Sequence, residues 1–222
     1  IPLFPEAFET YAPLIGWLAV IGIVYGSLVS MAQKDMKKLI AYSSVAHLGV
    51  VMLGLLAFTT AGTVGAVYQM LNHGISTGGL FLIVGMIYER RHTRMIADFG
   101  GLSKVMPIFA TFFMIITLSS VALPGTNGFV GEFLILMGAF KNNVVYGTLA
   151  TTGVILGAVY MLWMFQRVMF GVVTKEENRN LKDLDGREIL ILTCMVFFII
   201  LMGVYPKMFF KKMDTSVTEY LA

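Results

Sequence analysis

Cysteine is almost absent from this sequence, which excludes several kinds of redox site. The single one, Cys194, lies in an apolar run and has no partner for an internal disulfide, so we expect a small packed residue. The chain also lacks paired cysteines for an iron–sulfur cluster, a CxxCH haem site, a Walker loop and a G-x-G-x-x-G turn. We therefore expect no electron or nucleotide chemistry here, and no cofactor bound by this chain.

Charged residues are also scarce. They make up 13% of the 222 residues, about half the share of an ordinary soluble domain, whereas 57% of the residues are hydrophobic. The net charge of +3 could suit nucleic acid, but the basic residues lie in short segments between apolar runs. We expect a lipid bilayer around this chain and no nucleic acid partner.

The first residues carry no secretion signal. The stretch "IPLFPEAFETY" has no basic region, no cleavage site of small residues and no initiator methionine. We expect the chain to begin within a longer protein, so that part of any site lies upstream.

Apolar runs long enough to cross a bilayer occur six times. A spanning helix needs about 20 residues to cross about 30 Å of hydrocarbon. The predicted spans are residues 11–32, 38–58, 62–88, 106–140, 145–170 and 188–206. We group residues 11–172 as one unit of five spans, 173–187 as a loop and 188–210 as a final transmembrane helix. The expected fold class is an all-α polytopic membrane protein with six transmembrane helices.

Basic residues divide unequally between the loops. Twelve of the sixteen lie in or beside the first, third and fifth loops: Lys34, Lys37, Lys38, Arg90, Arg91, Arg94, Lys104, Arg167, Lys175, Arg179, Lys182 and Arg187. The other four are Lys141, Lys207, Lys211 and Lys212. Under the positive-inside rule the odd-numbered loops face the cytoplasm or matrix, so both chain ends face the outer side.

The fourth predicted span is too long for one straight helix. Residues 106–140 would extend about 52 Å as a helix, beyond the hydrocarbon thickness even with tilt. The motif "LPGTNG" at 123–128 predicts a break, because Pro124 removes a backbone donor. A second half-helix can then begin with Thr126 or Asn127 as its N-cap. Discontinuous helices are typical of transport sites, although a proline kink that serves only packing is an alternative.

Glu132 is the only acid well inside an apolar segment. An unpaired charge there costs about 3 kcal/mol on insertion scales, so the carboxyl must be neutral, paired or hydrated. Each of these states suits a proton carrier. The structural alternative is a glutamate that bonds the broken backbone.

Two histidines also lie within predicted spans. His47 has Ser43 four residues earlier, and His73 has Gln69 four residues before it and Thr77 four residues after it. Such spacing places polar groups on one helical face. Because the ordinary pKa of histidine is near 6.5, the pattern suits proton relay, with a hydrogen bond between helices as the alternative.

Two further patterns have structural interpretations. Gly74 with Gly78, and Gly153 with Gly157, have the spacing of tight helix packing. The cluster "YERRHTR" is interpreted as a solvated loop with a role in topology.

Three segments carry a resemblance to a known family. "DMKKLIAYSSVAHLGVVMLG", "YQMLNHGISTGGLFLIVGMIYERRHTR" and "VALPGTNGFVGEFLILMGAF" resemble the antiporter-like subunit M family of NADH:quinone oxidoreductase, respiratory complex I, whose mitochondrial counterpart is subunit 4. The resemblance runs over nearly the whole chain and is to the C-terminal part of a fourteen-helix protein.

The resemblance implies a fold and a site. The first five spans would form the second of two inverted repeats, with a discontinuous fourth span, and the sixth would follow as a final helix. Glu132 would belong to the outward half of a proton pathway, with His47 and His73 in its central hydrophilic axis. NADH, FMN, iron–sulfur clusters and quinone would be bound by partner subunits, and neighbouring antiporter-like subunits would contact this one.

Three functions stay open at this point. The first is a proton-translocating subunit in an energy-transducing membrane. For the resembled family, the expected membrane is the bacterial plasma membrane. The second is a cation/proton antiporter of the Mrp type, or an antiporter-like subunit of a membrane-bound hydrogenase complex. The third is a structural spacer, which burial of three ionisable groups makes the least expected.

Overall fold

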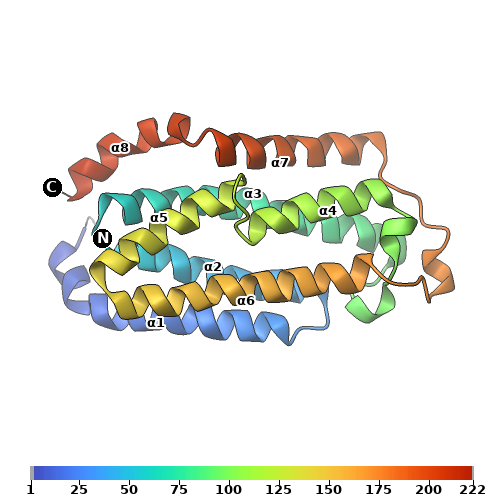
Figure 1. The fold of residues 1–222 in the computed structure, drawn as a ribbon, viewed down its shortest axis with the longest axis horizontal. Helices are drawn as coiled ribbons and strands as arrows, with labels where there is room; N and C mark the ends of the chain where they lie inside the picture. The colour runs from blue at the N-terminus through green and yellow to red at the C-terminus, as the bar shows by residue number, and fades with distance from the viewer. Residues whose placement is uncertain (1–2, 222) are drawn as a thin grey trace.

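The computed structural model describes residues 3–221, which are mostly helical. Its helices are α1 (Pro5–Met31), α2 (Met36–Leu56), α3 (Thr60–Arg91), α4 (Pro107–Ser120), α5 (Asn127–Asn142), α6 (Val144–Met169), α7 (Gly186–Val204) and α8 (Lys207–Leu221). Short 3-10 turns, η1 (Ile96–Asp98), η2 (Leu102–Lys104) and η3 (Glu176–Asn178), lie in two of the connections. The long helices run side by side as a bundle (Figure 1).

Five of the described helices, α1, α2, α3, α6 and α7, are long and apolar enough to cross a membrane. The expectation of an all-α fold with membrane-crossing helices is therefore confirmed. α4 is a shorter apolar helix, and α5 continues beyond it in the same direction (Figure 1). The connections at 32–35, 92–106 and 170–185 share one end of the bundle, and both ends of the described chain lie at the other.

Polar side chains cap the N-termini of several helices. The Asp35 carboxylate accepts from two backbone N–H groups at the start of α2, and the Thr59 hydroxyl accepts from Gly62 N at the start of α3. Asp185 and Glu188 form a reciprocal capping box at the start of α7. These bonds satisfy amides that have no partner within the first helical turn.

The segment between α4 and α5, residues 121–126, is irregular and is called the helix break below. Pro124 cannot donate a backbone hydrogen bond, and Ala122 and Gly125 have φ values of +57° and +93°. Thr126 occupies the N-cap position of α5, but its hydroxyl donates to the Leu123 carbonyl at 2.7 Å instead of capping the helix. The chain therefore leaves the helical path between α4 and α5.

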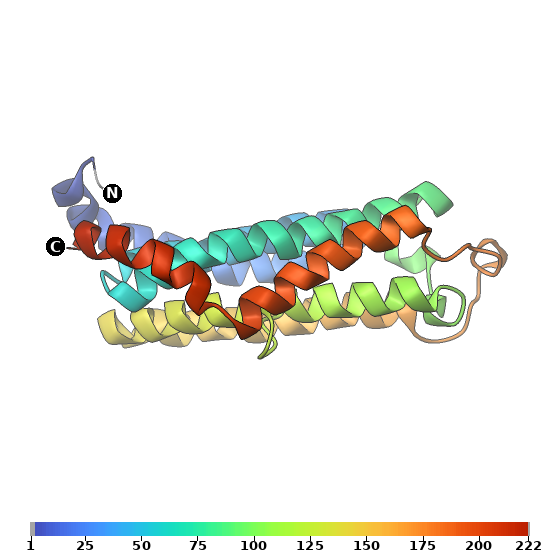
Figure 2. The ribbon, with the colours of Figure 1, turned by 90° about the horizontal axis from the view of Figure 1, so that it is seen from above.

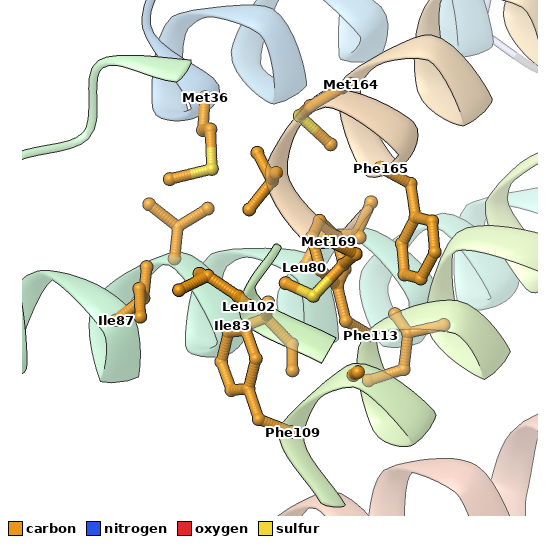
Figure 3. Close-up of a cluster of buried hydrophobic side chains, with 14 of the residues drawn as sticks. Met36, Leu80, Ile83, Ile87, Leu102, Phe109, Phe113, Met164, Phe165 and Met169 are labelled. Carbon is orange, nitrogen blue, oxygen red and sulfur yellow. The ribbon is translucent and has the colours of Figure 1, made fainter. Parts of the chain in front are cut away.

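The larger core lies toward the end of the bundle with the three longer connections. Figure 3 shows side chains from α2, α3, α4, α6 and η2 pointing toward one another. Its labelled members are Met36, Leu80, Ile83, Ile87, Leu102, Phe109, Phe113, Met164, Phe165 and Met169. Burial of these side chains fixes how α4 and α6 lie against α3.

α7 covers one side of this bundle and is itself mostly exposed. It packs on α3, α4 and α5 (Figure 2). The buried residues of its narrow packing face include Leu192 and Ile199. Cys194 points away from that face and is exposed, so the prediction of a packed residue is wrong within the described chain. The residues predicted as one final helix at 188–210 belong to α7 and α8, because the chain turns at Tyr205 and Pro206.

Of the four glycines predicted to pack tightly against another helix, only Gly153 does so. A Cβ on Gly74 or Gly78 would have nothing within 4 Å, so this pair contacts no other described helix closely. A Cβ on Gly153 would overlap the side chain of Ile23, which marks a close approach of α6 to α1. At Gly157 the nearest atom would lie 3.8 Å away, an ordinary contact.

The cluster "YERRHTR" is not the solvated loop that was expected. Arg90 lies in the last turn of α3 and donates to both carboxylate oxygens of Glu188, at 2.8 and 2.6 Å. The Arg91 guanidinium donates to the Asn178 side chain at 2.6 Å. These bonds fasten the connection before α7 to the end of α3.

Candidate functional site

Glu132 lies in α5, just after the helix break, and its side chain is 7% exposed. Its Oε1 atom accepts a hydrogen bond of 3.2 Å from Gln69 Nε2 of α3. The same oxygen lies 3.2 Å from Nδ1 of His47 on α2. One carboxylate oxygen thus contacts polar groups from two other helices, as a charge in an apolar region requires.

His73 continues this row of polar side chains on α3. Its ring centroid lies 5.5 Å from that of His47, and its Nδ1 lies 3.0 Å from the Thr77 hydroxyl. Glu132, His47 and His73, the three residues proposed from sequence, therefore lie in one row across α5, α2 and α3.

Ser43 does not join this row as its spacing suggested. Its hydroxyl donates to the Ile40 carbonyl at 2.7 Å, and Ser44 bonds the same carbonyl at 3.4 Å. Serine within a helix commonly bonds the preceding turn in this way. The side chain that lies within hydrogen-bonding distance of His47 is Glu132 instead.

Glycines bring α3 and α5 close enough for these contacts. A Cβ on Gly131 would overlap the side-chain oxygen of Gln69 and lie 2.8 Å from Asn72 Nδ2. A Cβ on Gly65 would lie 2.8 Å from Leu134 Cβ. Because both positions lack a side chain, Gln69 can reach the Glu132 carboxylate from the facing helix.

A second polar cluster, which the sequence analysis missed, joins the helix break to this row. Asn72 Nδ2 donates to Gln69 Oε1 at 3.0 Å and to the Asn127 carbonyl at 2.8 Å. The Ser119 hydroxyl donates to Asn127 Oδ1 at 2.6 Å and lies 2.7 Å from the Ser76 hydroxyl. Two features of the sequence could have identified this cluster. Asn72 lies three residues after Gln69, and Asn127 directly follows the break.

Two small cavities adjoin the row, and His47 lines both. One has a volume of about 20 Å³ and is also lined by Glu132, Ser120 and Tyr160. The other has a volume of about 10 Å³ and is also lined by Gln69, Asn72, His73, Ser76 and Thr77. His47 therefore lies between a space that reaches the carboxylate and a space that reaches the second histidine.

The chain matches one family model over residues 1–158, and that model is described as NADH:quinone oxidoreductase/Mrp antiporter, TM. The chain belongs to this family. Within the NADH:quinone oxidoreductase/Mrp antiporter family, it is 49% identical over 221 residues to NADH-quinone oxidoreductase subunit M of Rickettsia bellii. It is 47% identical over 219 residues to NADH-ubiquinone oxidoreductase chain 4 of Marchantia polymorpha. These alignments cover 100% and 99% of this chain but 45% and 44% of the relatives, so the chain spans less than half of their length.

Two solved structures agree with the fold. A chain of respiratory complex I from Thermus thermophilus with bound NADH superposes with a TM-score of 0.92 at 37% identity, covering 98% of this chain and 46% of that one. A chain of the Mrp complex from Dietzia sp. DQ12-45-1b superposes with a TM-score of 0.85 over 95% of this chain and 47% of that one. Its 18% identity extends the likeness to the fold alone.

Within residues 3–221, no group of three or more His, Cys, Asp or Glu side chains is placed to hold a metal ion. The row from His73 to Glu132 offers a different chemistry, in which neighbouring groups exchange a proton and each can carry it.

Proposed function

We propose that this chain is the C-terminal part of a proton-translocating membrane subunit of NADH:quinone oxidoreductase, and that protons pass along His73 and His47 to Glu132. The names of the relatives support the assignment to that complex. The row of three ionisable side chains supports the path.

The observation that carries the proposal is the position of His47. Its Nδ1 lies 3.2 Å from Glu132, within reach of direct proton transfer. When His47 is protonated, the imidazolium and the carboxylate neutralise each other. Transfer of the proton leaves two neutral groups, so neither state places an isolated charge in the apolar region.

The step between the two histidines needs an intermediary. Their ring centroids are 5.5 Å apart, and both rings line the 10 Å³ cavity. Asn72 also lines it, and its Oδ1 atom is buried without a hydrogen-bond partner among the described residues. The cavity has room for about one ordered water, which can relay a proton from His73 to His47.

The same proposal assigns a topology. α4 and α5 together form a sixth, discontinuous span, and the helix break lies beside the Glu132 site. The connections with most basic residues face the cytoplasm of a bacterial cell, so both ends of the chain face the outer side of the plasma membrane. The rest of the subunit and neighbouring antiporter-like subunits surround this part, and the redox cofactors belong to partner subunits.

Replacement of Glu132 tests the path. In the intact complex, Glu132→Gln is expected to abolish pumping by this subunit and Glu132→Asp to retain part of it. Proton uptake into inside-out membrane vesicles, driven by NADH, measures the effect. Glu177→Gln is a matched control, because Glu177 is an exposed acid in η3. Full pumping by the Glu132→Gln complex would falsify the proposed path.

A cation/proton antiporter is the alternative within the family. At 18% identity the Mrp complex offers no support beyond the fold, whereas the complex I relatives are far more similar. Sodium-dependent proton exchange by the purified protein, without redox partners, would favour the antiporter.

A further inference from the structure

The end of α7 has an unusual hydrogen bond. Pro206 has no N–H, so the Met202 carbonyl four residues earlier has no partner within its own helix. The Tyr68 hydroxyl of α3 donates to this carbonyl at 2.6 Å, and both residues are buried. The Tyr68 ring also packs edge-on against Phe209 and Phe210 of α8. α3 therefore holds the turn between α7 and α8.

The residue after Met202 lies directly on the helix break. A Cβ on Gly203 would overlap the Gly125 carbonyl oxygen and lie 2.5 Å from the carbonyl carbon of Thr126. Because these contacts are with backbone atoms, no change of rotamer can make room for a side chain. α7 and the break thus meet backbone against backbone.

The break is joined to the carboxylate by three hydrogen bonds. The Asn127 carbonyl, directly after the break, accepts from Asn72, whose side chain also donates to Gln69. Gln69 in turn donates to Glu132. Tyr68 immediately precedes Gln69 on α3, so one helical turn contacts the end of α7 and the carboxylate.

We propose that Tyr68 and Gly203 position the Glu132 site by seating the end of α7 on the helix break. Neither residue touches the transferred proton. The Tyr68 hydroxyl fixes the end of α7 against α3. Gly203 lets the backbone of α7 approach the helix break closely, and this approach keeps the Asn127 carbonyl in contact with Asn72. The inference rests on the proposed proton path, since the arrangement it maintains is the one that presents Gln69 to the carboxylate.

Two substitutions test this role in the intact complex. Tyr68→Phe removes only the hydroxyl, and Gly203→Ala adds one methyl group where α7 meets the break. Loss of one buried hydrogen bond changes an equilibrium by about two- to tenfold, so we expect pumping per NADH oxidised to fall about twofold or more in Tyr68→Phe. Gly203→Ala should lower it at least as much, because a methyl group against backbone atoms overpacks the contact. The pH profile of pumping should also be displaced, which a loss of assembled complex alone would not cause.

Matched controls are present in the same chain. A Cβ on Gly186 of α7 would meet nothing within 4 Å, and Tyr25 of α1 is 64% exposed, so Gly186→Ala and Tyr25→Phe should leave pumping unchanged. Rates are normalised to NADH oxidation by an artificial acceptor, which reports the amount of assembled complex. If Tyr68→Phe and Gly203→Ala pump like these controls while Glu132→Gln blocks pumping, the positioning role is wrong and the path stands. If Glu132→Gln also pumps normally, the proposed path fails as well.

Discussion

Arg90 and Glu188 lie 98 residues apart in sequence and form a two-pronged ion pair, with N···O distances of 2.8 and 2.6 Å. Both side chains are largely buried, at 17% and 6% exposure. The Arg90 guanidinium also donates to the backbone carbonyls of Lys182 and Asp183. One side chain therefore joins the end of α3, the connection before α7 and the first turn of α7.

Removal of the Arg90 guanidinium should destabilise the connection before α7. Arg90→Met leaves the buried Glu188 carboxylate without its charged hydrogen-bond donor, and we expect a loss of about 2 kcal/mol in local stability. Hydrogen exchange at the amides of residues 173–187 measures the change. Lys182→Met removes one positive charge from the same end, where the Lys182 side chain is exposed, and should have little effect. Equal exchange in both variants would contradict the role given to Arg90.

The start of α4 provides a second test. The Asp183 carboxylate accepts from Ile108 N at 2.9 Å and from Phe109 N at 3.0 Å, so it caps a helix to which it does not belong. Asp183→Ala should cost about 1 kcal/mol, the usual value of a lost cap, and should increase hydrogen exchange in the first turn of α4. Glu177→Ala, at an exposed acid of the same connection, should leave that exchange unchanged.

The contact of α6 with α1 can be tested with two glycines. Gly153→Ala would drive a methyl group into Ile23, so we expect a loss of about 1–3 kcal/mol, as for other overpacked sites. A Cβ on Gly22 would meet nothing within 4 Å, and Gly22→Ala should be neutral or slightly stabilising, because alanine favours helix. Thermal unfolding of the two variants in detergent measures the difference. Equal melting temperatures would show that the approach at Gly153 is not tight.

His47 should act together with Glu132 rather than independently. His47→Gln is expected to lower pumping by this subunit to nearly the level of Glu132→Gln, because it removes the group between the carboxylate and His73. The double variant should pump no less than Glu132→Gln alone, since residues of one path are not additive. His92→Gln, at the end of α3, is the control. Additive losses would indicate that the two residues serve separate paths.

The main features of the fold could be predicted because they depend on local sequence. Apolar runs show where helices can cross a membrane, and Pro124 with its neighbouring glycines marks the break without knowledge of any other helix. The types of residue in the row were also predictable, because an ionisable group in an apolar segment needs a partner or a use. Glu132 and His73 stand out in the sequence for this reason.

The partners of these residues could not be predicted, because they come from distant parts of the chain. Helical spacing favoured Ser43 beside His47, but the serine bonds its own helix and the carboxylate of α5 lies beside the ring. Spacing likewise favoured close packing at Gly74, whereas that face of α3 contacts no other described helix closely. Periodicity identifies a face but not the element that covers it.

The cap that Asp183 provides also has a consequence for the order of events during synthesis. The carboxylate follows the amide of Ile108 by 75 residues, so α4, α5 and α6 all leave the ribosome before the first turn of α4 can be completed. An insertion intermediate that ends with α6 therefore lacks the two hydrogen bonds that cap α4. The first turn of α4 gains its cap only after the segment before α7 has been synthesised, so this cap is a late step in the maturation of the bundle.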